Sequence, residues 1–281
     1  MTGKTDLHIH TTISDGRHSP SEIVRKAAQL GLGTIAICDH DNIDGIQLAL
    51  TAAANFPQLK VIPGVEISTF APGSEVHILG YCMNHKNLKF VNALRASRNS
   101  RIERAREMIT KLNKLNINIS WQQVKEVAGS STVGRPHLAK VMLDKGYINS
   151  FKEAFDKYIG LGGPAYVERQ KITPSEAVKL IKEADGLPVL AHPLTIHEPE
   201  KLIGLLKPIG LRGVEVHYNG YNLNERQALT LLADQYNLLP TGGSDYHGID
   251  DNTETMIGDA GVPKECAERL IALAEKLEQN P

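Results

Sequence analysis

The chain has little of what marks secreted, membrane-spanning or strongly charged proteins. Its three cysteines, Cys38, Cys82 and Cys266, are too few and too scattered for a disulfide framework or a thiolate zinc site. No apolar run approaches the roughly 20 residues that a bilayer requires, and the first residues lack the pattern of a signal peptide. These absences favour a cytoplasmic protein without a membrane partner.

Charge of either sign is also not in excess. The formal net charge of -1 argues against broad electrostatic adhesion to nucleic acid or anionic membranes, so any phosphate binding must be focused in a local pocket. The sequence contains neither a Gly-x-x-x-x-Gly-Lys phosphate loop nor a Gly-x-Ser-x-Gly nucleophile elbow. Hydrophobic residues make up 41% of the 281 residues, enough for a sizeable core in one barrel-sized domain or two smaller ones.

What the sequence does contain is a repeated pairing of candidate metal ligands. His8 and His10 stand two residues apart in an apolar run, and in a strand such residues point to the same face. Asp245 and His247 repeat this spacing near the other end of the chain. A lone histidine at the end of an apolar run is more often a hydrogen-bonded core residue than a ligand, but the recurrence favours a metal cluster.

Further imidazoles and carboxylates close or interrupt β-like runs between these two pairs. They are Asp15, His40, Glu66, His77 and His192. Imidazole and carboxylate without thiolate suit manganese, iron or zinc better than copper(I), and the set is too rich in nitrogen for magnesium or calcium alone. The number of candidate ligands exceeds what one ion can bind.

The hydrophobic pattern predicts an α/β fold. β-like runs alternate with helical patterns, which is typical of parallel strands joined by crossover helices, and Ser19 to Glu22 and Thr173 to Glu176 read as capped helix starts. The alternation stops from about Lys86 to Pro164, where the pattern is helical. We therefore predict a (β/α) barrel of about seven strands, formed by residues 1–85 and 165–281, with an inserted α-helical domain at 86–164. The candidate ligands fall at the carboxyl ends of strands, where such barrels gather their active sites.

Several short motifs together resemble a known family. They are Asp-Leu-His-Ile-His-Thr, Asp-His-Asp, Pro-Gly-Val-Glu, His-Ile-Leu-Gly-Tyr, Ala-His-Pro and Gly-Ser-Asp-Tyr-His, in this order from Asp6 to His247. They resemble the polymerase and histidinol phosphatase (PHP) family of metal-dependent phosphoesterases, which implies a distorted (β/α)7 barrel. The segment Arg135-Pro136-His137 makes the chain more similar to the branch of nucleoside 3',5'-bisphosphate phosphatases and a related 5'-to-3' exoribonuclease than to histidinol phosphatase.

The resemblance also implies a trinuclear metal centre in which Glu66 bridges two ions. The implied ligands are His8, His10, Glu66 and Asp245 for the first ion, Asp15, His40 and His247 for the second, and Glu66, His77 and His192 for the third. These residues are also the predicted catalytic residues, with metal-bound hydroxide as the nucleophile. Many family members have a histidine where Asp15 stands, and this hard carboxylate favours manganese over zinc.

Residues outside this set carry more than one interpretation. Four arginines recur every three residues in the helical segment: Arg95, Arg98, Arg101 and Arg104. They form either a phosphate-binding surface or a solvated face of the helix. The resemblance implies that Arg101, Arg104, Arg135 and His137 line the substrate pocket. Asp39 and Asp41 read as partners of ligands or loop caps rather than ligands. Glu215 and His217 share one face of a predicted strand. They either contact the metal site or lie in the barrel interior as hydrogen-bonded polar side chains.

The sequence thus predicts a metal-dependent phosphoesterase acting on a small nucleotide, a nucleoside 3',5'-bisphosphate above all, or trimming short RNA from its 5' end. One alternative is a histidinol-phosphate-type phosphatase. Another, of a different class, is a non-catalytic metal-binding PHP module that partners a polymerase. The complete ligand set and the lack of an attached polymerase domain count against that module, and no obligatory protein partner is evident.

Overall fold

The computed structural model describes residues 3–71, 74–129, 133–168, 172–248 and 255–279. The backbone divides into two compact units, Met1–Leu94 with Ile172–Pro281, and Arg95–Lys171. Among the described residues, none of the helices is both long and apolar enough to cross a membrane. The assignment of substrate binding to a separate inserted domain at 86–164 stays a prediction.

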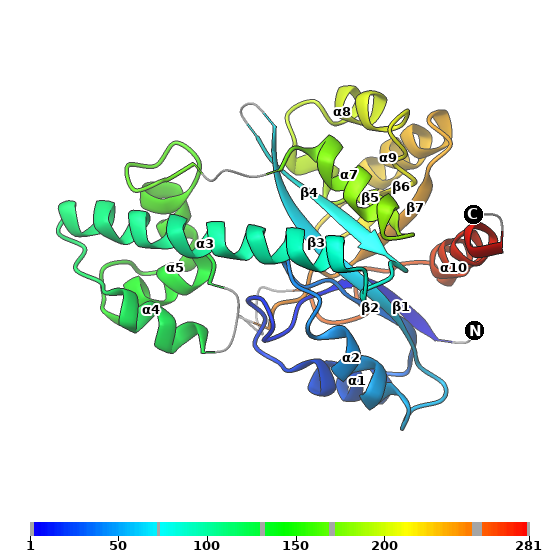
Figure 1. The fold of residues 1–281 in the computed structure, drawn as a ribbon, viewed down its shortest axis with the longest axis horizontal. Helices are drawn as coiled ribbons and strands as arrows, with labels where there is room; N and C mark the ends of the chain where they lie inside the picture. The colour runs from blue at the N-terminus through cyan, green and yellow to red at the C-terminus, as the bar shows by residue number, and fades with distance from the viewer. Residues whose placement is uncertain (1–2, 72–73, 130–132, 169–171, 249–254, 280–281) are drawn as a thin grey trace. The chain divides into compact units, whose positions relative to one another are not determined.

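The first unit is built around a seven-stranded sheet whose spatial order follows the chain (Figure 1). Its strands are β1 (Lys4–Ile9), β2 (Leu32–Ile37), β3 (Lys60–Ala71), β4 (Ser74–Tyr81), β5 (Leu187–Leu190), β6 (Gly213–Tyr218) and β7 (Leu239–Gly243). A bridge between Ile9 and Tyr246 joins the end of β1 to the residues after β7, so the barrel is nearly closed. The predicted seven-stranded α/β barrel is confirmed.

One strand departs from the expected parallel arrangement. β4 is antiparallel to both β3 and β5, whereas the remaining neighbours are parallel. Only two residues separate β3 from β4 in the sequence, and a parallel pair needs a crossover of about a dozen residues or more. The parallel strands expected from the alternating pattern are therefore wrong at β4, which forms a hairpin with β3.

Asp6 stabilises the junction between β1 and the residues that follow β7, which we call the seam. Its buried carboxylate accepts the backbone N–H of Ser244 at 3.0 Å and that of Gly258 at 2.8 Å. The backbone N–H of Asp245 donates to the carbonyl of His8 at 2.9 Å. The first strand and the segment that follows the last strand are thus held together by buried hydrogen bonds.

Helices surround this sheet. They are α1 (Pro20–Gln29), α2 (Ile46–Ala53), α7 (Pro174–Glu183), the short 3-10 helix η2 (Pro193–Thr195), α8 (Pro199–Leu206), α9 (Leu223–Gln235) and α10 (Lys264–Gln279). The predicted capped starts are confirmed, because Ser19 and Glu22 form a capping box on α1, and Thr173 and Glu176 form one on α7. β2 is buried along its whole length, as expected for a parallel strand covered on both faces.

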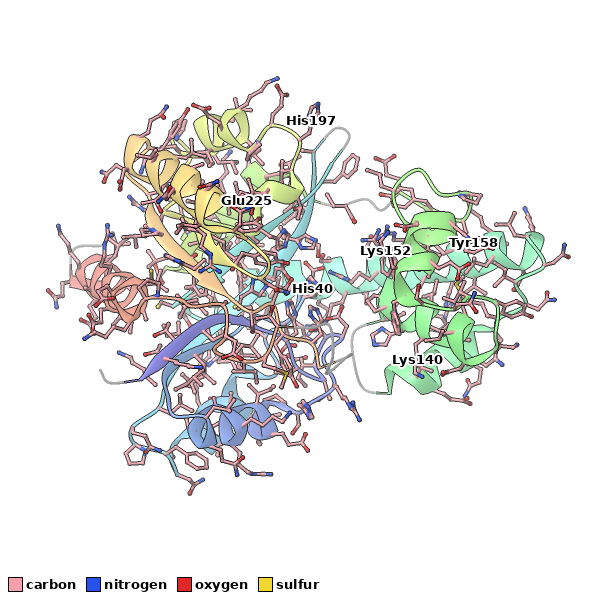
Figure 2. The ribbon with its side chains drawn as sticks, turned by 180° about the vertical axis from the view of Figure 1, so that it is seen from behind. His40, Lys140, Lys152, Tyr158, His197 and Glu225 are labelled. Carbon is pink, nitrogen blue, oxygen red and sulfur yellow. The ribbon has the colours of Figure 1, made fainter. Side chains whose placement is uncertain are left out.

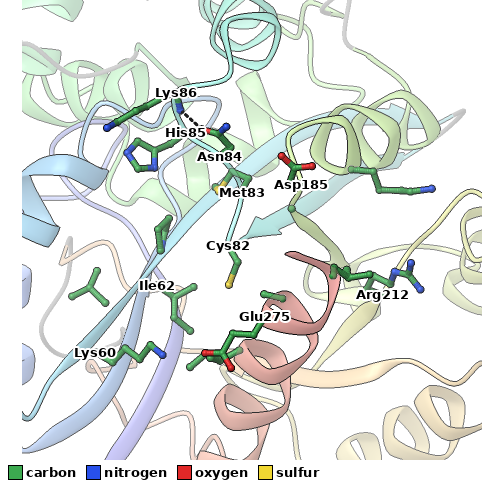
Figure 3. Close-up of a pocket in the computed structure, with 17 residues that line it drawn as sticks. Lys60, Ile62, Cys82, Met83, Asn84, His85, Lys86, Asp185, Arg212 and Glu275 are labelled. Carbon is green, nitrogen blue, oxygen red and sulfur yellow. Dashed lines mark hydrogen bonds between the residues drawn. The ribbon is translucent and has the colours of Figure 1, made fainter. Parts of the chain in front are cut away.

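The amino end of the barrel is covered by α10. Side chains of this helix, Ala267 and Leu270 among them, share a buried cluster with Leu7 and Val189 from the strands. Beside α10 lies a pocket of about 980 Å³, where the Cys82 and Glu275 side chains are drawn (Figure 3). Its lining comes from the start of β3 and the residues after β4, so it lies at the opposite end from the predicted ligands.

The second unit is helical in its described part. It contains most of α3 (Leu88–Lys114), then α4 (Trp121–Ala128), α5 (Arg135–Asp144), α6 (Phe151–Ala154) and a turn of π-helix, η1 (Phe155–Ile159). Its own core includes Met108, Leu112, Leu138, Met142 and Ile159. Lys140 and Lys152 are exposed on its surface (Figure 2).

Candidate metal centre

The two ligand pairs that the sequence predicted meet inside the barrel. His8 and His10 are fully buried, with their Nε2 atoms 3.2 Å apart. Asp245 follows β7 with a φ of 53°, and its Oδ1 atom lies 3.4 Å from His8 Nε2 and 3.0 Å from His10 Nε2. The seam between β1 and β7 therefore brings ligands from the two ends of the chain to one point.

Among the described residues, three groups of side chains have ligand atoms within 4.8 Å of one another, close enough to hold an ion each. The groups are His8, His10, Glu66 and Asp245; His10, Asp15, His40 and His247; and His40, Glu66 and His77. The first group equals the set predicted for the first ion. The second adds His10 to the predicted set, and the third contains His40, which the prediction assigned to the second ion alone.

Glu66 on β3 lies at the centre of these groups. Its Oε1 atom is 2.8 Å from His77 Nδ1 and 3.0 Å from His192 Nε2. Its Oε2 atom is 2.9 Å from His40 Nδ1 and 3.3 Å from His10 Nε2. Because its two oxygens face different imidazoles, Glu66 has the geometry of a bridging ligand. His192 reaches the third group through Glu66 Oε1.

Electrostatics keeps the carboxylates of the cluster anionic. Burial alone would raise the pKa of Glu66, but the neighbouring His40, His77 and His8 hold it well below its usual range. The pKa values of Asp15 and Asp245 are held low in the same way by nearby imidazoles. These side chains thus carry the negative charge that a divalent cation requires.

The histidines of the cluster respond to burial in different ways. Burial lowers the pKa of His77 to about 4, so its ring is neutral at pH 7 and has a lone pair for a metal. Burial also disfavours the charged form of His10, but the carboxylates of Asp245 and Glu66, which lie 3.0 and 3.3 Å from its Nε2 atom, raise its pKa to about 10. Metal binding at His10 would therefore displace a proton.

The donor set fits divalent metal ions. Several of its buried atoms have no well-directed hydrogen bond within the described ranges, namely Asp15 Oδ1, His40 Nδ1, Glu66 Oε2 and Asp245 Oδ1. Burying such atoms without a partner is costly, because each has lost its hydration. Cations placed among them would satisfy all of these atoms together.

Asp39 and Asp41 belong to none of the three groups. Asp39 accepts hydrogen bonds from the Thr11 hydroxyl at 2.8 Å and the Ser14 hydroxyl at 2.7 Å, and Ser14 Oγ lies 3.4 Å from His10 Nδ1. Asp41 accepts the backbone N–H of Ser68 at 3.0 Å. Their predicted role as supports of the ligand loops is confirmed by these contacts. His40 lies in the loop between them (Figure 2).

A bulge in β6 decides which of its side chains reach the cluster. The register with β7 shifts between Glu215 and His217, so these residues do not share a face as predicted. Glu215 is fully buried with Oε1 3.0 Å from His8 Nδ1, and the Tyr218 hydroxyl donates to Asp245 Oδ2 at 2.8 Å. Burial and the charge of Arg226 lower the pKa of His217, consistent with a position outside the cluster. Sequence reasoning missed Tyr218, since no local signal marks a bulge.

Three of the four predicted substrate-binding residues have contacts within the second unit. Arg104 is buried, and its Nε donates to the Val167 carbonyl at 2.8 Å. His137 Nδ1 accepts the backbone N–H of Gly134 at 2.9 Å, and the Arg135 guanidinium lies 5.4 Å from the Phe155 ring centroid. Arg101 is partly buried. Their role in substrate binding stays a prediction.

The PHP domain family model matches residues 6–171. The chain belongs to the PHP family. It is 35% identical to a 5'-3' exoribonuclease of Haemophilus influenzae over 88% of this chain and 91% of the relative. It is 31% identical to a 3',5'-nucleoside bisphosphate phosphatase of Chromobacterium violaceum over 93% of both chains.

A solved structure agrees with the fold. A predicted metal-dependent phosphoesterase of Bifidobacterium adolescentis superimposes with a TM-score of 0.86 at 26% identity, over 97% of this chain and 96% of that one. Membership of the PHP phosphoesterases confirms the predicted enzyme class: the chain is a metal-dependent hydrolase of phosphoric esters.

Proposed function

We propose that this PHP enzyme hydrolyses a phosphate ester of a small nucleotide, a nucleoside 3',5'-bisphosphate above all, and releases nucleotides from the 5' end of short RNA. The observation that carries the proposal is the cluster of three ligand groups that share His10, His40 and Glu66 at the carboxyl end of the barrel. Nucleotides and RNA fragments arise inside cells, so a cytoplasmic location goes with this proposal.

The cluster would hold three divalent ions. Their ligands would be His8, His10, Glu66 and Asp245; Asp15, His40 and His247; and Glu66, His77 and His192. When bound, such ions lower the pKa of a water molecule and neutralise charge on the phosphoryl oxygens. The hard carboxylate of Asp15 in an imidazole-rich set favours manganese, with iron or zinc as alternatives.

The burial of the ligands indicates from which side the substrate approaches. His8, His10 and Glu66 have side-chain exposures of 0 to 1%, so they form the floor of the site. The side chains of His77 and Asp245 are 18% and 19% exposed, and His40 and His247 are similar. A phosphate group would therefore reach the cluster between these partly exposed side chains, while the buried residues keep water from the floor.

The two proposed substrates share their chemistry. A nucleoside 3',5'-bisphosphate carries a 5' phosphate and a 3' phosphoester, and so does the first nucleotide of a 5'-phosphorylated RNA. Hydrolysis at the 3' position releases a nucleoside 5'-monophosphate from either, with the 5' phosphate as a recognition group. The relatives that act as exoribonuclease and as bisphosphate phosphatase support this common substrate class.

Recognition of the 5' phosphate is proposed for the inserted helical unit. Its Arg101, Arg104, Arg135 and His137 supply the guanidinium and imidazole groups that bind phosphate oxygens. Binding a group that does not react positions the one that does, so the selectivity of the enzyme would come from these residues.

The test is a parallel assay of manganese-loaded protein with adenosine 3',5'-bisphosphate, histidinol phosphate and 5'-phosphorylated oligoribonucleotides. We expect adenosine 5'-monophosphate from the first and mononucleotides from the last, with little phosphate from histidinol phosphate. The Glu66→Gln protein, purified identically, controls for contaminating phosphatases. Preference for histidinol phosphate would select the alternative phosphatase. Inactivity with all three despite bound metal would favour a non-catalytic module that partners a polymerase.

A further inference from the structure

Glu215 touches two members of the cluster from inside the barrel without being a ligand itself. We infer that Glu215 is a positioning residue that fixes the proton of His8 on Nδ1 and so leaves Nε2 available to bind a metal. This inference rests on the proposed metal centre and adds a residue to it. Glu215 belongs to none of the three ligand groups.

The contacts of Glu215 occupy both of its oxygens. The carboxylate is fully buried, its Oε1 atom lies 3.0 Å from His8 Nδ1, and its Oε2 atom accepts the backbone N–H of His192 at 2.8 Å. His8 and His192 belong to the sets proposed for the first and third ions. One carboxylate therefore orients ligands of two different ions.

The donor and acceptor roles around Glu215 are fixed by chemistry. A backbone N–H can only donate, so Oε2 is an acceptor towards His192. An ionised carboxylate can only accept, so Nδ1 of His8 must carry a proton. The lone pair of a neutral His8 is then on Nε2, which faces Asp245 Oδ1 at 3.4 Å and Glu66 Oε2 at 3.5 Å. Only this form of the ring can bind a cation among those carboxylates.

Glu215 also stabilises the backbone conformation of His192. His192 has a φ of 27° and a ψ of 60°, a conformation that residues other than glycine rarely adopt. The hydrogen bond from its N–H to Glu215 holds this turn in place, and the turn directs His192 Nε2 at Glu66 Oε1.

Two substitutions separate positioning from mere packing. In Glu215→Gln the amide oxygen must face the His192 N–H, so the amide NH₂ group faces His8 Nδ1 and forces the proton onto Nε2. Glu215→Ala leaves a space in which a water molecule can accept a hydrogen bond from the Nδ1–H group of His8. Positioning therefore predicts that Gln weakens metal binding more than Ala. Packing predicts the reverse order, because Ala leaves a cavity.

The experiment is a titration of metal-free protein with Mn²⁺, in which isothermal titration calorimetry measures the affinity of each site. We expect the tightest sites of Glu215→Gln to weaken about 10- to 100-fold, the range for partners of metal-binding histidines, and those of Glu215→Ala to weaken less. Thr241→Val is the matched control. Thr241 is buried on β7 directly opposite Glu215 and belongs to no ligand group, so this variant should bind Mn²⁺ as the parent protein does.

A second measurement needs no variant. In the parent protein loaded with Zn²⁺, which is diamagnetic, long-range ¹H–¹⁵N spectra should show His8 protonated on Nδ1. A proton on Nε2, unchanged Mn²⁺ affinity in Glu215→Gln, or a greater loss in Glu215→Ala would each overturn the inference. If the parent protein binds neither metal, the proposed metal centre itself fails, and this outcome is distinct from the other three.

Discussion

The barrel and the helical unit use their polar side chains in different ways. In the barrel, Glu66 Oε2, His40 Nδ1 and Asp245 Oδ1 are buried ligand atoms with no well-directed hydrogen bond in the part of the chain described. In the helical unit, Arg104 and His137 instead hold their own unit together through backbone contacts.

This difference distinguishes side chains that are arranged to bind a ligand from side chains that also stabilise the fold. A buried acceptor without a donor is unfavourable unless something else binds it, so the barrel cluster indicates a cation. A buried arginine that donates to a carbonyl has a structural role already. The metal ligands of this enzyme are therefore expected to affect activity alone, whereas two of the four predicted phosphate contacts should also affect stability.

The largest effect should come from Glu66→Gln, which tests whether the barrel cluster acts as one unit. Glu66 faces ligands of all three groups, so the change should reduce kcat by roughly 1000-fold, equivalent to about 4 kcal/mol of transition-state stabilisation. Elemental analysis should show the loss of more than one ion per chain. A variant that keeps its metal and its kcat would show that the cluster does not depend on a bridging carboxylate.

Arg135→Ala tests whether the helical unit selects the substrate. If its guanidinium binds the non-reacting phosphate, kcat/KM for adenosine 3',5'-bisphosphate should decrease. The decrease should correspond to a loss of about 2 to 4 kcal/mol of transition-state stabilisation. The same quantity for p-nitrophenyl phosphate, which has no second phosphate, should change little. Equal losses on both substrates would assign Arg135 to the fold or to the metal centre.

Arg104→Ala tests the structural side of the comparison. Removing the hydrogen bond to Val167 and the stacking on the Tyr166 ring should lower the free energy of unfolding by about 2 kcal/mol, measured by urea denaturation. Arg95→Ala, at an exposed position of the same helix, is the control and should change stability by less than about 0.5 kcal/mol. Unchanged stability in both variants would leave Arg104 with a role in phosphate binding only.

Tyr218→Phe should have the smallest effect. It removes one hydrogen bond to Asp245 Oδ2 but no ligand. We therefore expect the activation free energy to rise by about 1 kcal/mol, which is a roughly fivefold decrease in kcat, with a nearly normal melting temperature. Steady-state kinetics at saturating Mn²⁺ is the measurement. A loss as large as that of Glu66→Gln would mean that Tyr218 contacts the substrate itself.

The sequence predicted those parts of the site that depend on regular spacing. His8 and His10 were predictable because residues two apart share a face of a strand. Asp245 and His247 have the same spacing but lie beyond the end of β7, where Asp245 has a φ of 53°. The hairpin between β3 and β4 and the bulge in β6 were not predictable, since both depend on local backbone geometry that similar apolar runs do not reveal. The roles of Glu215 and Tyr218 followed only from that bulge.

The buried carboxylate of Asp6 has a consequence for the way the enzyme is made. It accepts hydrogen bonds from residues 238 and 252 positions later in the chain, so its partners leave the ribosome long after Asp6 does. Contacts between such distant residues form slowly, because a long loop must close first. A growing chain thus exposes His8 and His10 long before Asp245 arrives to complete their group. The enzyme is expected to acquire its metals only after Asp245 has been synthesised, and a nascent chain that stops before β7 should have no activity.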